Sequence, residues 1–88
     1  MATQETQTWI PVKEAARIAR EYLQELMPEI PQDDISLEEV EPGDKEWLVT
    51  MGYSDPRRPA FLDRGRIYKR FRIDALEGQV LSMNIRNA

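Results

Sequence analysis

Cysteine and histidine are both absent from the 88 residues of this chain. Without cysteine there is no disulfide framework, no thiolate metal site and no thiol nucleophile. Without histidine, the chain lacks the commonest general base and the commonest nitrogen ligand of zinc, and Ser-His catalysis is excluded. We therefore predict that the protein is not an enzyme and that it holds no cofactor or metal ion.

Long apolar runs are also missing. No stretch approaches the roughly 20 apolar residues that a membrane-spanning helix needs. The first residues, MATQETQTW, have neither the basic nor the apolar region of a secretory signal. We expect a cytoplasmic protein without membrane contact. Residues 1–8 are polar and without periodicity, and we expect them to form a flexible terminus before a single domain over residues 9–88.

The net charge of −4 hides an asymmetry between the two halves of the chain. Residues 1–46 carry twelve acidic and four basic side chains, a net charge of −8, whereas residues 47–88 carry eight basic and four acidic side chains, a net charge of +4. We expect the two halves to neutralise each other where they pack. The overall acidity disfavours nucleic acid as a partner, because a polyanion is repelled outside a local basic patch.

The segment after Pro11 has the periodicity of an amphipathic helix. Proline suits the first helical position, and Pro28 and Pro31 are expected to end the helix because they cannot donate the next backbone bond. Apolar residues recur three and four positions apart, at Val12, Ala15, Ala16, Ala19, Leu23, Leu26 and Met27.

Two alternating stretches after the helix predict strands. In ISLEEVE, residues 35–41, the alternation breaks at Val40, which indicates either a bulge near Glu38 and Glu39 or a later strand start. Asp33 or Asp34, just before it, is expected to cap a turn. WLVTMGY, residues 47–53, places on one face Trp47, Val49, Met51 and Tyr53.

The stretch RIYKRFRIDALEGQVLSMNIR, residues 66–86, predicts a closing β-hairpin. Its arms carry two apolar rows, Ile67, Phe71 and Ile73 in one arm and Leu81, Met83 and Ile85 in the other. If Ile73 lies opposite Leu81, both rows share one face. Gly78 is expected at a positive φ in the turn, where the carboxylate of Asp74 accepts backbone N–H groups. We therefore predict an α+β fold, with one N-terminal helix packed on a three- to four-stranded antiparallel sheet.

The helix PVKEAARIAREYL and the hairpin YKRFRIDALEGQVLSM together resemble PepSY domains, over most of residues 11–86. The resemblance implies a protein-binding module that binds peptides or inhibits a peptidase. The hairpin positions that match the family's pattern are Tyr68, Ile73, Asp74, Ala75, Gly78, Val80 and Leu81.

A second resemblance is to small bacterial immunity proteins, which share a helix, a WLV-like strand and a closing hairpin, and it implies toxin neutralisation. Both implied roles are protein binding without catalysis. An alternative from another class is a self-associating module, either a monomer or a homodimer that pairs through an open sheet edge at WLVTMGY or MNIR.

Four side chains alternate along the first arm of the hairpin and form the main candidate binding surface: Arg66, Tyr68, Arg70 and Arg72. Guanidinium groups spaced about 7 Å apart around an aromatic ring suit an acidic protein surface or a phosphate. The alternative is that they pair across the sheet with Glu46, Glu77 or the acidic residues of the first strand.

The loop over residues 54–64 is longer than a hairpin turn needs, and loops of this length are often functional. It carries a candidate recognition tip of Arg57, Arg58 and Phe61, although Phe61 is also suited to cover the core. Glu38, Glu39 and Glu41 lack the spacing of a calcium-binding loop.

Overall fold

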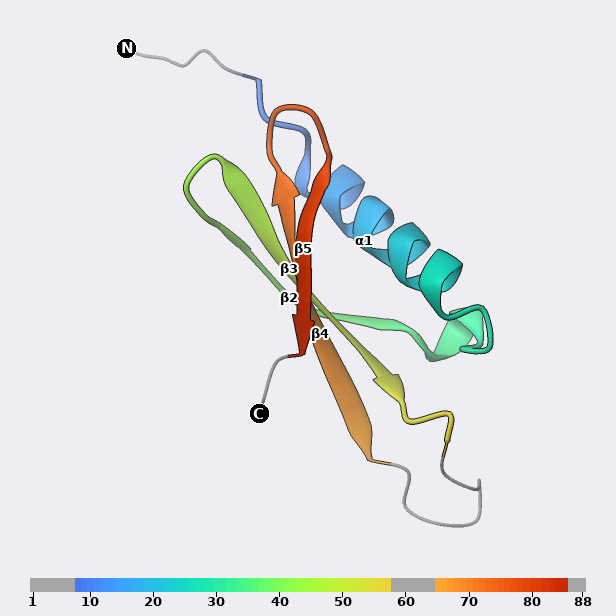
Figure 1. The fold of residues 1–88 in the computed structure, drawn as a ribbon. Helices are drawn as coiled ribbons and strands as arrows, with labels where there is room; N and C mark the ends of the chain where they lie inside the picture. Colours follow the sequence, from blue (N-terminus) through green and yellow to red (C-terminus); the bar gives the residue numbers. More distant parts are fainter. Residues whose placement is uncertain (1–7, 58–64, 86–88) are drawn as a thin grey trace.

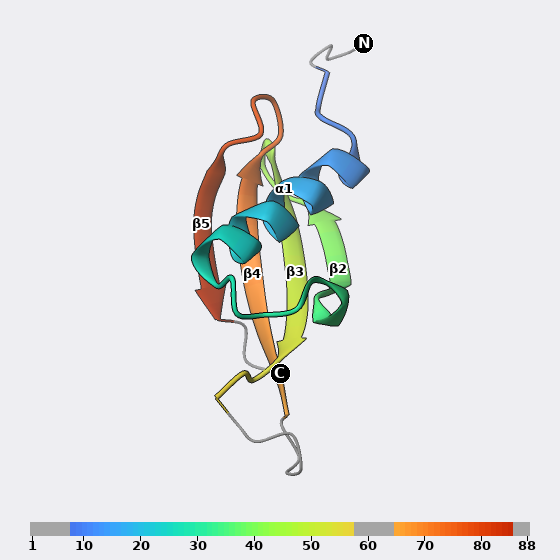
Figure 2. The ribbon, with the colours of Figure 1, turned by 90° about the vertical axis from the view of Figure 1, so that its right-hand side faces the viewer.

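The computed structural model describes residues 8–57 and 65–85, and these form one helix on a four-stranded antiparallel sheet with strand order β2-β3-β4-β5. This confirms the predicted α+β arrangement. Apart from Thr8, the terminus over residues 1–8 lies outside the described residues. Figure 1 shows the helix lying along one side of the twisted sheet, and Figure 2 shows it in front of the strands. The elements are α1 (Val12–Leu26), the 3₁₀ turn η1 (Gln32–Asp34), β2 (Ser36–Pro42), β3 (Glu46–Ser54), β4 (Arg66–Asp74) and β5 (Val80–Ile85).

Helix α1 begins one residue later than predicted. Pro11 precedes the helix with extended backbone, and its carbonyl accepts a hydrogen bond from the N–H of Ala15 at 3.1 Å. The helix ends at Leu26, before Pro28, because proline cannot extend the helical hydrogen bonding. The described part of the chain contains no helix with both the length and the apolar character that crossing a membrane requires.

The hydrophobic core lies between α1 and the sheet face turned toward it, which we call the inner face. Ala15, Ala19 and Leu23 are the buried residues of the helix. The ring of Tyr22 meets Phe71 edge-on, with the ring centroids 6.2 Å apart. The sheet contributes to this core the fully buried side chains of Val49, Met51, Tyr53, Phe71 and Ile73.

Strand β2 contains a bulge at Glu38. The register with β3 shifts between Leu37 and Glu39, so that Leu37 opposes Met51 and Val40 opposes a buried valine. Both apolar residues of β2 therefore face the helix despite their uneven spacing. Of the two readings of the broken alternation, the bulge is confirmed.

Strand β5 has a different register from the predicted one. Val80, and not Leu81, pairs with Ile73, because the register shifts at this point of the hairpin. The prediction for Leu81 was wrong, and its side chain is 46% exposed. Farther along, Phe71 pairs with Met83 as predicted.

The turn between β4 and β5 is built around Asp74 and Gly78. Gly78 has a φ of 80°, a left-handed conformation that glycine adopts without strain. The carboxylate of Asp74 accepts a hydrogen bond of 2.6 Å from the N–H of Glu77, as predicted.

The segment before α1 is tied to the end of the sheet. The N–H of Ile10 donates to the carbonyl of Ala75 at 2.7 Å, and the indole N–H of Trp47 donates to the carbonyl of Ile10 at 3.0 Å. The ring of Trp9 meets that of Trp47 edge-on at 5.4 Å. Both tryptophans therefore close one end of the domain.

Candidate functional site

The sheet face turned away from α1, which we call the outer face, carries the arginine row of β4. Within the described residues, no helix or strand lies over this face (Figure 1). Toward β3, Arg70 pairs with Thr50 and Tyr68 with Gly52. Toward β5, Arg70 pairs with Asn84, and Arg72 pairs with Ser82. The four predicted side chains of β4 thus lie on one open surface.

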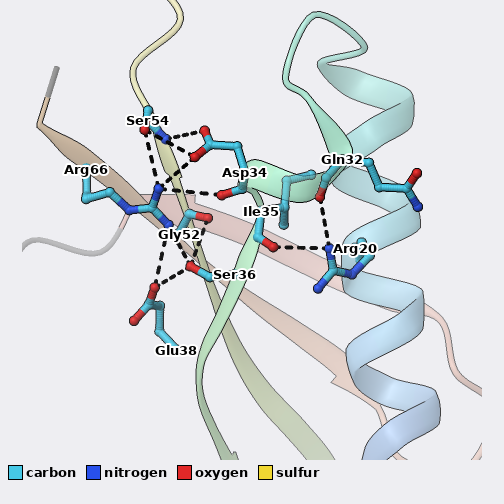
Figure 3. Close-up of polar contacts among 9 residues, drawn as sticks. All are labelled: Arg20, Gln32, Asp34, Ile35, Ser36, Glu38, Gly52, Ser54 and Arg66. Atoms are coloured by element: carbon cyan, nitrogen blue, oxygen red, sulfur yellow. Dashed lines mark hydrogen bonds and ion pairs between the residues drawn. The ribbon is translucent and has the colours of Figure 1, made fainter.

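At one end of the row, Arg66 is engaged by groups from three other elements (Figure 3). Its Nη1 donates to Oδ1 of Asp34 at 3.0 Å, and its Nη2 donates to Oγ of Ser36 at 2.6 Å. The Nη2 atom also lies 3.7 Å from a carboxylate oxygen of Glu38. Glu38 is one of the acidic residues of the first strand that were expected to pair across the sheet, whereas Asp34 of η1 is a partner that was not expected.

Asp33 or Asp34 was expected to cap a turn. The carboxylate of Asp34 instead joins η1 to the end of β3. Its carboxylate accepts the N–H of Ser54 at 2.8 Å and the hydroxyl of Ser54 at 3.2 Å. The backbone N–H of Ser54, with Arg66 adding its charge, holds the pKa of Asp34 below its ordinary value. Asp34 therefore connects η1 with the end of β3 and the start of β4.

Arg72, farther along the row, is also paired. Its Nη2 and Nε atoms both contact Oε1 of Glu46, at 2.9 and 3.1 Å. The carboxylate of Glu46 raises the pKa of Arg72 because it stabilises the charged guanidinium. This is the cross-strand partner that the sequence suggested for the row.

Arg70 lies between these two engaged arginines and differs from both. Over residues 8–57 and 65–85, it makes no hydrogen bond or ion pair, and its buried Nε has no partner. The only other buried side-chain polar atom without a partner in that part of the chain is Oγ of Ser82. Leaving such a group unpaired costs about 1–3 kcal/mol, so native structures contain few of them. Both lie on the outer face, on the paired strands β4 and β5.

Tyr68 covers the middle of β3 next to Arg70. A β-carbon on Gly52 would come within 3.0 Å of Cε1 of Tyr68, so the ring occupies the space that the glycine leaves. Thr50, the next outer-face residue of β3, is only 1% exposed. The long side chains of β4 therefore cover the outer face of β3.

The loop residues do not join this surface. The side chain of Arg57 is 84% exposed and contacts Asp55 at 3.3 Å. It lines a hollow of about 300 Å³ together with Tyr53 and Lys69. These two residues lie on the inner face. Arg58 and Phe61 lie outside the described residues. Of the seven predicted residues, the structure brings together the four of β4.

Sequence reasoning missed Ser82. The alternation along the hairpin placed it on the outer face, and serine at such a position usually contacts water. Nothing in the sequence indicated that its hydroxyl would be buried without a partner.

No family model, no curated protein and no solved structure matches this chain. The resemblances to PepSY domains and to immunity proteins therefore stay predictions. Among the described residues, no three acidic side chains form a group that could hold a metal ion.

Proposed function

We propose that the protein is a non-enzymatic module that binds an acidic surface of another protein through the centre of its outer face. The observation that carries this proposal is the pair of buried, unpartnered atoms, Nε of Arg70 and Oγ of Ser82. Both PepSY-like peptide binding and toxin neutralisation are compatible with it, since both are protein binding without catalysis.

The two arginines on either side of Arg70 are already engaged, which limits the proposed binding site to the centre of the row. Arg66 and Arg72 already contact carboxylates of the same chain, so a partner would have to displace those contacts to use them. Arg70 has no such competitor among the described residues. A carboxylate from a partner would give Arg70 the charge-assisted hydrogen bonds that it lacks, and these are the strong ones.

Tyr68 gives the site an aromatic neighbour. Tyrosine and arginine are enriched among the residues that dominate protein interfaces, because they combine large contact area with hydrogen bonding. The ring of Tyr68 is supported from below by Gly52 and loses little conformational freedom on binding. The proposed contact surface therefore consists of Tyr68, Arg70 and Ser82.

The experiment is affinity capture from a lysate of the native organism with the immobilised 88-residue chain, followed by quantitative mass spectrometry. Arg70→Glu reverses the charge at the centre of the proposed surface. Lys13→Glu makes the same change on α1 and serves as the matched control, because Lys13 is exposed on the other layer.

We expect a protein that wild type and the Lys13→Glu variant retain and that the Arg70→Glu variant loses. Identical captured proteins for all three chains would remove the outer face as the binding surface.

A further inference from the structure

Deepening the proposed function, on which this step rests, we infer that the edge of β5 binds an extended segment of the partner as a fifth strand. The segment would carry apolar side chains toward the inner face and carboxylates toward the outer face. Three features support it: the unprotected edge of β5, the hollow beside it on the inner face and the arginines beside it on the outer face.

The two edges of the sheet differ in their protection against strand addition. Charged residues, prolines and bulges are the usual features that prevent an edge from pairing with another chain. Strand β2 has all of them, with its bulge at Glu38 and Pro42 at its end. Strand β5, with the sequence VLSMNI, has no charged residue and no proline. Its register shift lies at its beginning, so the part from Ser82 onward remains regular.

Next to β5 on the inner side, a hollow of about 190 Å³ separates the strand from α1. Ile18, Tyr22 and Val80 line it, and Glu21 and Glu25 stand at the helix side. A strand added to β5 would direct every second side chain toward this side of the sheet. Apolar side chains at those positions would cover exposed hydrophobic surface.

On the outer side, β5 presents Ser82 and Asn84 between the added strand and the arginines of β4. A residue of the added strand beside Asn84 would lie two strand spacings, roughly 10 Å, from Arg70. The extended side chains of a glutamate and an arginine together span this distance. Its carboxylate would reach the Nη end of the guanidinium of Arg70, which, unlike Nε, is not among the buried atoms.

A second copy of this chain fits the edge less well. Its own β5 would offer serine and asparagine, and no carboxylate, to Arg70. It would also bring the acidic side of its α1, with Glu21 and Glu25, toward the same residues of the first copy. A strand that alternates apolar and acidic residues avoids both problems.

The probe is a blocked, fluorescein-labelled heptapeptide that alternates glutamate and valine. Its affinity for the 88-residue chain is measured by fluorescence anisotropy. A peptide with lysine in place of glutamate is the charge control. Two further peptides carry N-methyl groups on every second residue, one on the odd and one on the even positions. Because only one set of N–H groups faces β5 in an added strand, only one of these two peptides should lose affinity.

We expect the glutamate peptide to bind, the lysine peptide not to bind, and Arg70→Glu to weaken binding about ten- to hundredfold, as hydrogen bonds to a charged group predict. One N-methylated peptide should bind at least about tenfold more weakly, and amide exchange in β5 should slow when the unmodified peptide is present. The Lys13→Glu variant should bind like wild type.

If Arg70→Glu abolishes binding but neither N-methylated peptide is weakened, the peptide binds by side chains alone. The edge inference then fails while the proposed function stands. Sedimentation that shows a dimer unaffected by the peptide would overturn the inference in favour of self-association through β5. Absence of binding by all peptides would overturn it as well, whereas the lysate experiment judges the proposed function separately.

Discussion

The ring of Tyr68 packs over Gly52 on the outer face of the sheet, so closely that a β-carbon at position 52 would lie 3.0 Å from Cε1 of the ring. An aromatic residue opposite a glycine compensates for the missing side chain and protects the backbone of the neighbouring strand. This contact buries Gly52 on the side of the sheet without a helix.

Gly52→Ala should lower the free energy of unfolding by about 1–3 kcal/mol, because the new methyl group must displace the ring of Tyr68 and the carboxylate of Glu38, whose Oε2 would lie 2.8 Å away. Urea denaturation measures the change. In a Tyr68→Ala background, the same substitution should cost less, because the ring is gone and only the carboxylate of Glu38 still crowds the new methyl group. Equal costs in both backgrounds would show that the ring does not constrain position 52.

Asp34→Asn should destabilise the fold at neutral pH by about 1 kcal/mol, the difference between a hydrogen bond to a charged and to a neutral acceptor. The pKa of Asp34 is lower in the folded chain than its ordinary value of 3.8. The carboxylate therefore stabilises the fold above about pH 4, and this contribution is lost as the pH falls below 3.8 and through the folded pKa. Urea titrations from pH 7 to pH 2 should show wild type and variant converging at the acidic end. A constant difference over this range would contradict the role of the charge.

Arg66→Met and Arg70→Met should differ in stability although both remove an arginine from the same row. Arg66→Met removes the guanidinium that contacts Asp34 and Ser36 and should cost about 1–3 kcal/mol. Arg70→Met puts an apolar methyl group at the place of the buried unpaired Nε and keeps the unbranched stem, so it should change stability by less than about 0.5 kcal/mol or raise it. Thermal and urea unfolding of both variants distinguish the two. A larger loss for Arg70→Met would mean that Arg70 has a partner within the chain.

Phe71→Ala should cost about 3–5 kcal/mol, a large part of the stability of a domain this small, because the fully buried ring leaves a cavity. Leu81→Ala is the contrasting variant. Since Leu81 is 46% exposed at the register shift, its truncation should cost less than about 1 kcal/mol. Comparable losses at both positions would restore the predicted pairing of Leu81 with Ile73.

The faces of the strands were predictable because successive side chains of a strand point to opposite sides of the sheet. The alternation placed Phe71 in the core and the arginines of β4 on the other side, and the structure agrees. The turn at Gly78 was predictable for a similar reason, since the local backbone requires glycine there.

The register of β5 was not predictable, because alternation does not indicate where an extra residue enters a strand. One inserted position exposes Leu81 and makes Val80 the partner of Ile73. Similarly, the sequence suggested several acidic partners for the arginine row but did not assign them to particular arginines. Asp34, which contacts Arg66, is separated from it by 32 positions in the chain.

By itself, the sequence determined which side chains of β3 and β4 share a face, approximately where the helix begins and ends, and the turn at Gly78, because these depend on local periodicity and on the backbone preferences of proline and glycine. Only the tertiary structure decided which arginines are neutralised. Carboxylates from η1 and β3 reach Arg66 and Arg72, whereas none reaches Arg70 within the described part of the chain. That difference depends on distances between segments far apart in the sequence, and local patterns do not contain it.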